Sequence, residues 1–330
     1  MSAIALRSPQ YKTITAGSNA AYATCSITIN GASSPQYVLR KDTSPQAIVL
    51  FEISELCLDF LTITFNGTYT AKTITISTVV NAYTSANALI NGTTFTDVGY
   101  DAYGTFMEGA NPVVPFGSRP TWLLSGDPNH TTINNEYYIY VPNSTAGSVP
   151  YIIANETMGY QSYGATDVEI TGSPAGVKMN IERVDCTKYG DGHKVTFVNK
   201  FGALQDIWFF LKSVNTTTKK SENYQRNIIS STGTFSVNSH TKQVYNTIAN
   251  TNITLSSGFY PEWANQWFEQ LLLSEQIWMT RPVPTNPSSS EVVPVNVKKN
   301  SITKKTVLND KLIQYTFNFD MSFDYINNVR

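Results

Sequence analysis

The C-terminal stretch Ile313–Tyr325, IQYTFNFDMSFDY, alternates large apolar and polar residues without interruption. Successive side chains of a β-strand point to opposite faces, so this pattern predicts one strand with an aromatic face and a polar face. At about 3.3 Å per residue the strand would extend roughly 40 Å, about twice the usual length. We expect a central strand of the last sheet, with its aromatic face on the core. Its SFDYINNVR end would be long enough to reach a neighbouring subunit.

The composition also favours a mainly β protein. Only 14% of the 330 residues are charged, against about 25% in average soluble chains. The surface must therefore be rich in Thr, Asn, Ser and Tyr, which suit strands and turns. Sparse charge also suits a protein whose surface is hidden in an assembly. The net charge of −1 gives no overall attraction to nucleic acid or to a membrane.

The apolar and turn patterns predict two β-sandwich-like domains. The N-terminal domain spans residues 1–118 and ends in the Pro-rich stretch NPVVPFGSRP. Its strongest patterns are three strands, a hairpin around an Asn-Gly turn, and a helical turn with Ser54 as its N-cap. The segments are ATCSITING (23–31), QYVLRK (36–41), AIVLFEI (47–53), the hairpin 62–80 and SELCLDFL (54–61).

The C-terminal domain, residues 119–330, is predicted to contain strands, one helix and the long terminal strand. NKFGALQD connects two strands, and the following run IWFFL (207–211) predicts a strand covered on both faces. The helix is expected at 261–273, with Trp263 and Trp267 on its core face. NTTTKKSENYQ (215–225) is typical of a polar loop, and the Pro-rich segment 281–294 of a loop or inter-subunit arm.

A search for chemical motifs predicts no catalytic, cofactor-binding or metal site. The cysteines and histidines lie far apart and form no disulfide or zinc pattern; they are Cys25, Cys57, Cys186, His130, His193 and His240. Buried thiols are the expected state of the cysteines. A basic run is interpreted as a solvated loop, with phosphate contact as the alternative; it comprises Lys212, Lys219, Lys220 and Arg226. The longest apolar runs, AIVLF and IWFFL, are far too short to span a membrane.

Four signatures, in order along the chain, resemble structural proteins from the tails of crAss-like podoviruses, phages that infect Bacteroides-type bacteria. They are IALRSPQYKTI with VLFEISELCLDFL, then YDAYGTFMEGANP, then VTFVNKFGALQDIWFFLK, and finally EQLLLSEQIWM with the chain from VPVNVKKN to the C-terminus. Cys57 and Leu58 stand where more polar residues would be expected. The signatures span most of the chain, apart from residues 121–170 and 213–260.

The resemblance implies a non-enzymatic virion protein made in the bacterial host cytoplasm. Such a protein would form a ring in the neck or tail barrel, with the twelvefold symmetry of the portal. Its partners would be copies of itself, the portal, neighbouring tail proteins, and DNA that passes without sequence-specific binding. No membrane contact is expected.

Two other classes of function remain open from the residues alone. A glycan-binding adhesin, or receptor-binding tail protein, would use exposed aromatic side chains; the candidates are Tyr100, Tyr103, Trp122 and Tyr160. A carbohydrate hydrolase would need two carboxylates that meet only in space; the candidates are Glu156, Asp167, Glu169 and Glu262.

Overall fold

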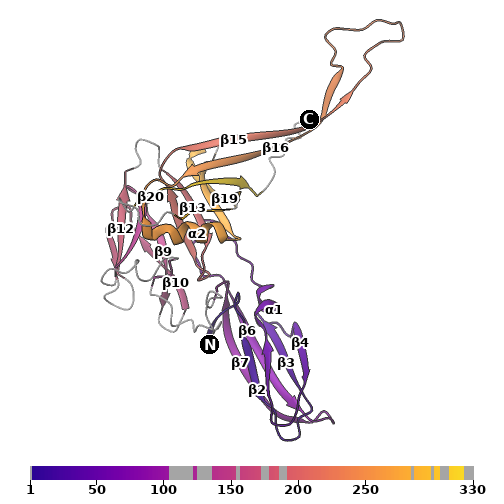
Figure 1. Cartoon of the computed structure of the whole chain (residues 1–330), viewed down its shortest axis with the longest axis vertical. Helices are drawn as coiled ribbons and strands as arrows, with labels where there is room; N and C mark the ends of the chain where they lie inside the picture. The colour runs from indigo at the N-terminus through magenta and orange to yellow at the C-terminus, as the bar shows by residue number, and fades with distance from the viewer. Residues whose placement is uncertain are drawn as a thin grey trace.

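The computed structural model describes residues 2–103, 122–124, 136–153, 157–171, 178–185, 192–283, 286–298, 301–304 and 312–322. Strands dominate, which confirms the predicted mainly β fold with one Trp-rich helix and a strand region near the C-terminus. Figure 1 shows an N-terminal lobe at one end of the molecule, a larger C-terminal lobe in the middle, and a long hairpin that projects from the larger lobe.

The N-terminal lobe packs a five-stranded sheet against a two-stranded sheet. Alternating small and β-branched residues of the strands fill the core between them, and Cys25 and Cys57 are fully buried there, as predicted. Burial raises the pKa of the Cys25 thiol to about 11 and that of Cys57 to about 12. In sheet order the strands are β1 (Ser2–Ala5), β7 (Leu89–Tyr100), β6 (Thr73–Tyr83), β3 (Tyr22–Ile29) and β4 (Tyr37–Asp42), with β2 (Tyr11–Thr15) and β5 (Ile48–Glu52) in the smaller sheet.

The predicted helical turn is confirmed as α1 (Ser54–Leu58), but its cap differs from the prediction. Ser54 is the first helical residue, and Ile53 occupies the N-cap position without a side-chain hydrogen bond. Glu52 does the capping instead: its carboxylate accepts hydrogen bonds from the Ser54 N–H, at 2.8 Å, and from the Ser54 hydroxyl. A carboxylate near a helix N-terminus satisfies donors that have no partner within the helix.

Of the two strands predicted for the hairpin at residues 62–80, only the second is present. Its second strand exists as β6, but residues 61–72 form no strand. They instead cross to the C-terminal lobe, where Phe65 packs edge-on against Trp278 with ring centroids 5.8 Å apart. Tyr69 packs against Tyr160 at 5.6 Å. Phe65 is thus buried against the other lobe, with Ile63 and Tyr69 half-buried beside it, whereas Leu61 still packs against the N-terminal core.

A seven-stranded sheet organises the C-terminal lobe, and smaller sheets pack around it. Its strands in sheet order are β14 (Leu204–Phe209), β13 (His193–Val198), β18 (Ile277–Val283), β19 (Asn286–Val297), β21 (Thr316–Met321), β16 (Lys242–Ser256) and β15 (Ser213–Gln225). The smaller sheets are β11 (Glu169–Thr171) with β12 (Lys178–Val184) and β8 (Glu136–Pro142), β9 (Gly147–Ile153) with β10 (Thr157–Tyr163), and β17 (Tyr260–Pro261) with β20 (Leu312–Ile313).

The predicted helix is confirmed as a 3-10 turn (Glu262–Ala264) that continues into α2 (Asn265–Leu273). Trp267, Phe268 and Leu271 on its inner face are buried in the core of the C-terminal lobe. Phe268 lies parallel to Phe317 of β21, with ring centroids 6.0 Å apart. In the described part of the chain, neither helix is long and apolar enough to cross a membrane.

The alternation in the C-terminal strand region is confirmed as far as the described residues extend. Ile313, Tyr315, Phe317, Phe319 and Met321 are buried, and β21 lies in the interior of the sheet between β19 and β16. The strand is nevertheless interrupted after Ile313, so it is not one continuous strand. At the interruption, Ser257 supplies the hydrogen bonds that a neighbouring strand would otherwise make to Tyr315. Its N–H donates to the Tyr315 carbonyl at 2.8 Å, and its hydroxyl accepts from the Tyr315 N–H at 3.0 Å. Residues 323–330, predicted to reach a neighbour, lie outside the described residues.

The Pro-rich segment 281–294 was predicted to be a loop or arm, and this is wrong at the level of secondary structure. Its described residues, 281–283 and 286–294, belong to β18 and β19, which pair with each other inside the seven-stranded sheet. Arg281 pairs directly with Glu291 across the hairpin, with Nε and Oε1 2.7 Å apart. Opposite charges at facing positions and a run of valines favour pairing in spite of the prolines.

Two further predictions concern the strands on either side of Lys212. The run IWFFL is buried or half-buried throughout, as predicted, but only its first three residues lie in β14. The connection from β13 to β14 is shorter than the predicted NKFGALQD, because Leu204–Asp206 already belong to β14. The segment 215–225, predicted as a polar loop, instead belongs to β15. Polar residues occupy both faces of β15 because neither face is buried, so the strand lacks the alternation by which strands are recognised.

Candidate functional site

The most prominent surface feature is a projecting β-hairpin, residues 213–256, which we call the arm. It consists of β15, the connection 226–241 and β16. Figure 1 shows β15 and β16 leaving the C-terminal lobe side by side and running away from it. Only the last five residues of β16, Asn252–Ser256, pair with β21. Within the described residues, the remainder of the arm pairs with itself alone.

Local sequence explains why the arm is nonetheless a regular hairpin. Thr216, Thr217 and Thr218 face Asn252, Thr251 and Asn250, and β-branched residues favour the extended backbone. A register shift after Glu222 leaves one extra residue on β16, which is a β-bulge. Near this bulge the rings of Tyr224 and Tyr245 meet edge to face, 5.9 Å apart.

The arm exposes far more apolar surface than its share of the chain would suggest. Eight of the nineteen exposed large apolar residues in the described chain lie on it. They are Val214, Tyr224, Ile229, Phe235, Val237, Val244, Tyr245 and Ile248. A two-stranded hairpin is at best marginally stable in water, and open strand edges are templates for pairing with another chain. Within the described residues, the arm therefore combines exposed apolar side chains with a strand edge that pairs with no other strand.

The charge of the arm differs in sign from that of the rest of the chain. Its residues 213–256 contain four basic residues and one acidic residue, a net charge of +3; they are Lys219, Lys220, Arg226, Lys242 and Glu222. Since the whole chain has a net charge of −1, the remainder carries −4. The four residues of the predicted basic run are exposed, which confirms their solvation, but Lys219 and Lys220 lie on β15 rather than in a loop; the run is Lys212, Lys219, Lys220 and Arg226.

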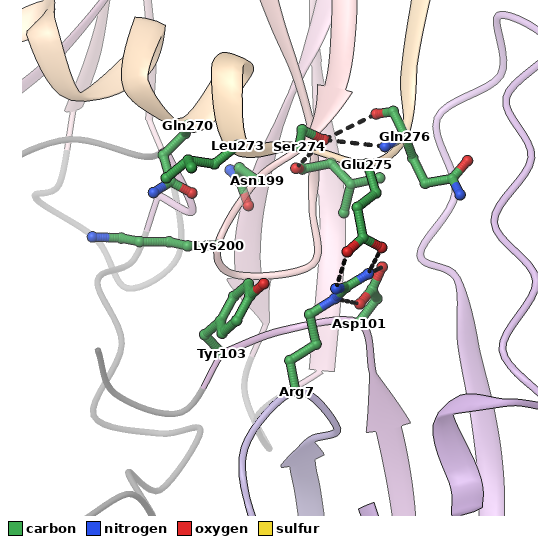
Figure 2. A pocket seen from close by; sticks show the side chains of 11 residues that line it. Arg7, Asp101, Tyr103, Asn199, Lys200, Gln270, Leu273, Ser274, Glu275 and Gln276 are labelled. Atoms are coloured by element: carbon green, nitrogen blue, oxygen red, sulfur yellow. Dashed lines mark hydrogen bonds and ion pairs between the residues drawn. The ribbon is translucent and has the colours of Figure 1, made fainter. Parts of the chain in front are cut away.

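The second feature is a cavity of about 250 Å³ at the seam between the lobes, shown in Figure 2. Arg7 follows β1 and Asp101 follows β7; since β1 and β7 pair in parallel, the two residues emerge side by side. The Arg7 Nε donates to Asp101, and its two terminal nitrogens donate to Glu275 of the C-terminal lobe at 3.0 and 2.8 Å. One guanidinium thus connects the lobes through two carboxylates.

Electrostatics at the seam stabilise the charged forms of both partners. Hydrogen bonding to Glu275 raises the pKa of Arg7 above its usual range, although partial burial opposes this. The same hydrogen bond lowers the pKa of Glu275. The Ser274 hydroxyl, also at the cavity, donates to the backbone carbonyls of Val198 and Gln276. Its hydroxyl proton is therefore directed to backbone oxygens rather than into the cavity, so the lining shows no paired nucleophile and base among the described residues.

The crossing segment 61–72 makes a second polar connection between the lobes. The Asp206 carboxylate accepts hydrogen bonds from the hydroxyls of Tyr69, at 2.5 Å, and Thr196, at 2.6 Å. Lys194 donates to the Tyr69 hydroxyl at 3.0 Å. Burial, reinforced by the charge of Asp206, raises the pKa of Tyr69 well above its usual range. Each group is satisfied by another, which is typical of a structural network.

The described candidate residues for a metal or hydrolase site lie on different elements, except Asp167 and Glu169, which are two residues apart. His193 begins β13, where burial lowers its pKa, whereas His240 lies in the exposed connection of the arm. Asp167 and Glu169 lie at β11, and Glu262 lies in the 3-10 turn before α2. No group of three potential metal ligands occurs among the described residues. Three of the candidates lie outside the described residues: His130, Glu156 and Cys186.

The aromatic residues proposed for glycan binding are mostly buried, which corrects the expectation of exposed platforms. Tyr100 and Trp122 are 2% and 0% exposed. Tyr160 is half-buried, and its hydroxyl accepts a hydrogen bond from the Leu204 N–H at 2.8 Å. Tyr103 alone of the four is exposed.

Comparisons with family models, curated proteins and solved structures found no match to this chain. Function must therefore be argued from the surfaces on the molecule itself. Sequence reasoning missed the most conspicuous of them, the arm, because a polar strand that projects from its lobe resembles a loop. A signal was present in the paired Thr- and Asn-rich segments around a Gly-containing connection, which favour a hairpin.

Proposed function

We propose that this chain is a virion structural protein that acts by self-assembly, as a ring-forming component of a phage neck or tail barrel. The observation that carries the proposal is the arm. It projects from the lobe, exposes eight large apolar residues and leaves strand edges open. Burying one such side chain contributes about 1.5–3 kcal/mol, so a partner that covers several of them would be held firmly.

We infer a ring because the proposed contact joins two different surfaces of the subunit. An arm that covers a different surface of the next copy makes a head-to-tail contact, which closes into a ring when the rotation per subunit divides a full turn. Twelve copies around the portal, neighbouring tail proteins above and below, and a central passage for DNA complete the proposal. In this role the protein needs no catalytic group, and we propose that it is not an enzyme.

Measuring particle mass with and without the arm tests this function. In the truncated variant, an Asn-Gly turn replaces residues 217–251, so that Thr216 and Asn252 remain paired beside β21. We expect the full chain, alone or mixed with portal protein, to form particles of many subunits in mass photometry. The truncated variant should remain a monomer with an unchanged melting temperature.

Two outcomes would contradict the proposal. A full chain that stays monomeric at all concentrations, with and without portal, argues against self-assembly. If this monomer also bound glycans, the adhesin alternative would be favoured. If the truncated variant formed rings equally well, the arm would not be required for assembly.

A further inference from the structure

We propose that the arm of one copy docks on the β11 edge of the next copy, with the open edge of β15 lying against β11. This inference rests on the proposed self-assembly and names the surface that receives the arm. The occupant is a second copy of this chain, and the contact is head to tail.

The first support is the placement of the two surfaces. Figure 1 shows the sheet that contains β12 on one side of the C-terminal lobe, and the arm leaving from the other side. Strand β11 pairs with β12 and so belongs to that far side. A head-to-tail contact joins two different surfaces, so each copy must present both of them to its neighbours. Surfaces on opposite sides of one subunit meet this requirement.

The second support is that β11 has an open edge. Among the described residues it pairs on one side only, with β12. Ile170 is buried beneath the sheet, while Glu169 and Thr171 are exposed. Val168, which precedes the strand, is 69% exposed. An exposed edge with an apolar residue beside it is suited to pairing with another strand.

The third support is charge complementarity. Residues 164–171 and 178–185 contain four carboxylates and two basic residues, a net charge of −2; they are Asp167, Glu169, Glu182, Asp185, Lys178 and Arg183. Lys178 pairs with Glu169 at 3.2 Å on the exposed face, so the net charge of this surface remains negative. Arg183 is directed to backbone oxygens, because its guanidinium donates to the carbonyls of Thr145, Gly164 and Asp167 at 2.5 to 2.9 Å. The arm brings a net charge of +3 to this surface, and complementary charge steers association and sets its orientation.

The length of the arm suits the contact. Thr217–Gln225 of β15 extends beyond the part of β16 that pairs with β21. At about 3.3 Å per residue these nine residues span roughly 30 Å, which is comparable to the width of a small domain. The arm can therefore reach the surface of an adjacent copy rather than its own lobe.

A protein partner fits the arm better than nucleic acid. Five of its eight exposed large apolar residues are aliphatic: Val214, Ile229, Val237, Val244 and Ile248. Nucleic-acid-binding grooves instead combine basic residues with aromatic side chains on which bases stack. The basic side chains of the arm are also accompanied by Glu222. Aliphatic surface is removed from water most effectively by another protein.

A charge-swap experiment tests the docking. Lys219→Glu with Lys220→Glu reverses the sign of the arm's net charge. Glu169→Lys with Glu182→Lys reverses the sign of the net charge of the receiving surface. We expect each pair of substitutions to raise the concentration at which particles form at least tenfold in mass photometry. The four substitutions combined should restore it to within about threefold of the original protein. A matched control, Arg40→Glu with Lys41→Glu, reverses two adjacent exposed residues of the N-terminal edge strand β4 and should change nothing. Circular dichroism verifies that each variant is folded.

The remaining outcomes separate this inference from the proposed function. If the original protein does not assemble, the proposed function fails and the inference fails with it. If the arm variant loses assembly, while the variant of the receiving surface assembles normally and the combination is not rescued, the arm docks elsewhere and only this inference is overturned. If arm reversal leaves assembly intact but abolishes binding of a 30-base-pair DNA duplex, the arm is a nucleic-acid surface, which also overturns it.

Discussion

Arg7 shows how one residue can connect two independently packed cores. Its guanidinium lies between Asp101 of its own lobe and Glu275 of the other, at the cavity of Figure 2. Asp101 is nearly buried, whereas Glu275 is 65% exposed at its side chain. The two halves of this connection therefore differ in strength, since water screens the exposed half.

Glu275→Gln should reduce the free energy of unfolding at neutral pH by about 0.5–1 kcal/mol, the range of a solvent-screened ion pair. The folded-state pKa of Glu275 is lowered from 4.5 by its hydrogen bond to Arg7. Its contribution is therefore fully present above about pH 5 and is lost as the pH falls through the lowered folded value. Urea unfolding should show a larger difference from the original protein at pH 7 than at pH 3. Glu55→Gln, on the exposed side of α1, is the control; an equal loss there would contradict the assignment.

At the scale of elements, α2 and β21 form the aromatic centre of the C-terminal lobe. Phe268 of α2 contacts Tyr315 and Phe317, and Phe209 of β14 meets Phe317 and Phe319 edge-on. The contacts of Phe209 join segments more than one hundred residues apart in the sequence, and those of Phe268 join segments about fifty residues apart. Both elements were predicted because each carries a strong period, helical in α2 and alternating in β21.

Trp267→Ala should lower the free energy of unfolding by about 3–5 kcal/mol, the cost of a cavity that replaces a large buried side chain. The Trp267 side chain is 2% exposed and lies edge to face with Tyr260, centroids 6.3 Å apart. Leu273→Ala at the end of the same helix, 63% exposed, controls for helix propensity and should cost less than about 1 kcal/mol. Guanidinium unfolding followed by circular dichroism measures both. Equal effects of the two substitutions would show that the Trp face is not core.

At the scale of the whole molecule, the lobes meet through backbone as well as side chains. Tyr103, at the end of the N-terminal lobe, donates its N–H to the carbonyl of Lys200 in the C-terminal lobe at 2.9 Å. The turn between β13 and β14 approaches so closely that a Cβ at Gly202 would lie 2.7 Å from the Asp101 carbonyl oxygen. This close approach fixes where one lobe lies against the other.

Gly202→Ala should lower the stability of the protein by more than the backbone strain of a left-handed residue accounts for. Gly202 has a φ of +76° and Gly31, in the turn after β3, has a φ of +68° with nothing near its missing Cβ. Gly31→Ala therefore reports the conformational strain of about 1 kcal/mol, and Gly202→Ala adds the collision with Asp101. Thermal unfolding should show the larger fall in melting temperature for Gly202→Ala. Identical falls would mean that the seam adjusts without cost.

Burial allowed several features to be predicted from the sequence alone. They are the strands β13 and β14, the helix α2, the aromatic face of β21 and the buried thiols of Cys25 and Cys57. Each buries one face or both, and burial imposes a period on the chain. The interruption after Ile313 and the crossing of residues 61–72 could not be predicted, because each depends on contacts with residues distant in sequence that the local alternation does not reveal. The Pro-rich segment pairs within a local hairpin, but its prolines are typical of a loop. The arm is the clearest case: it buries neither face, so its residues resemble a loop, and only the tertiary structure reveals a strand pair that projects from its lobe with open edges.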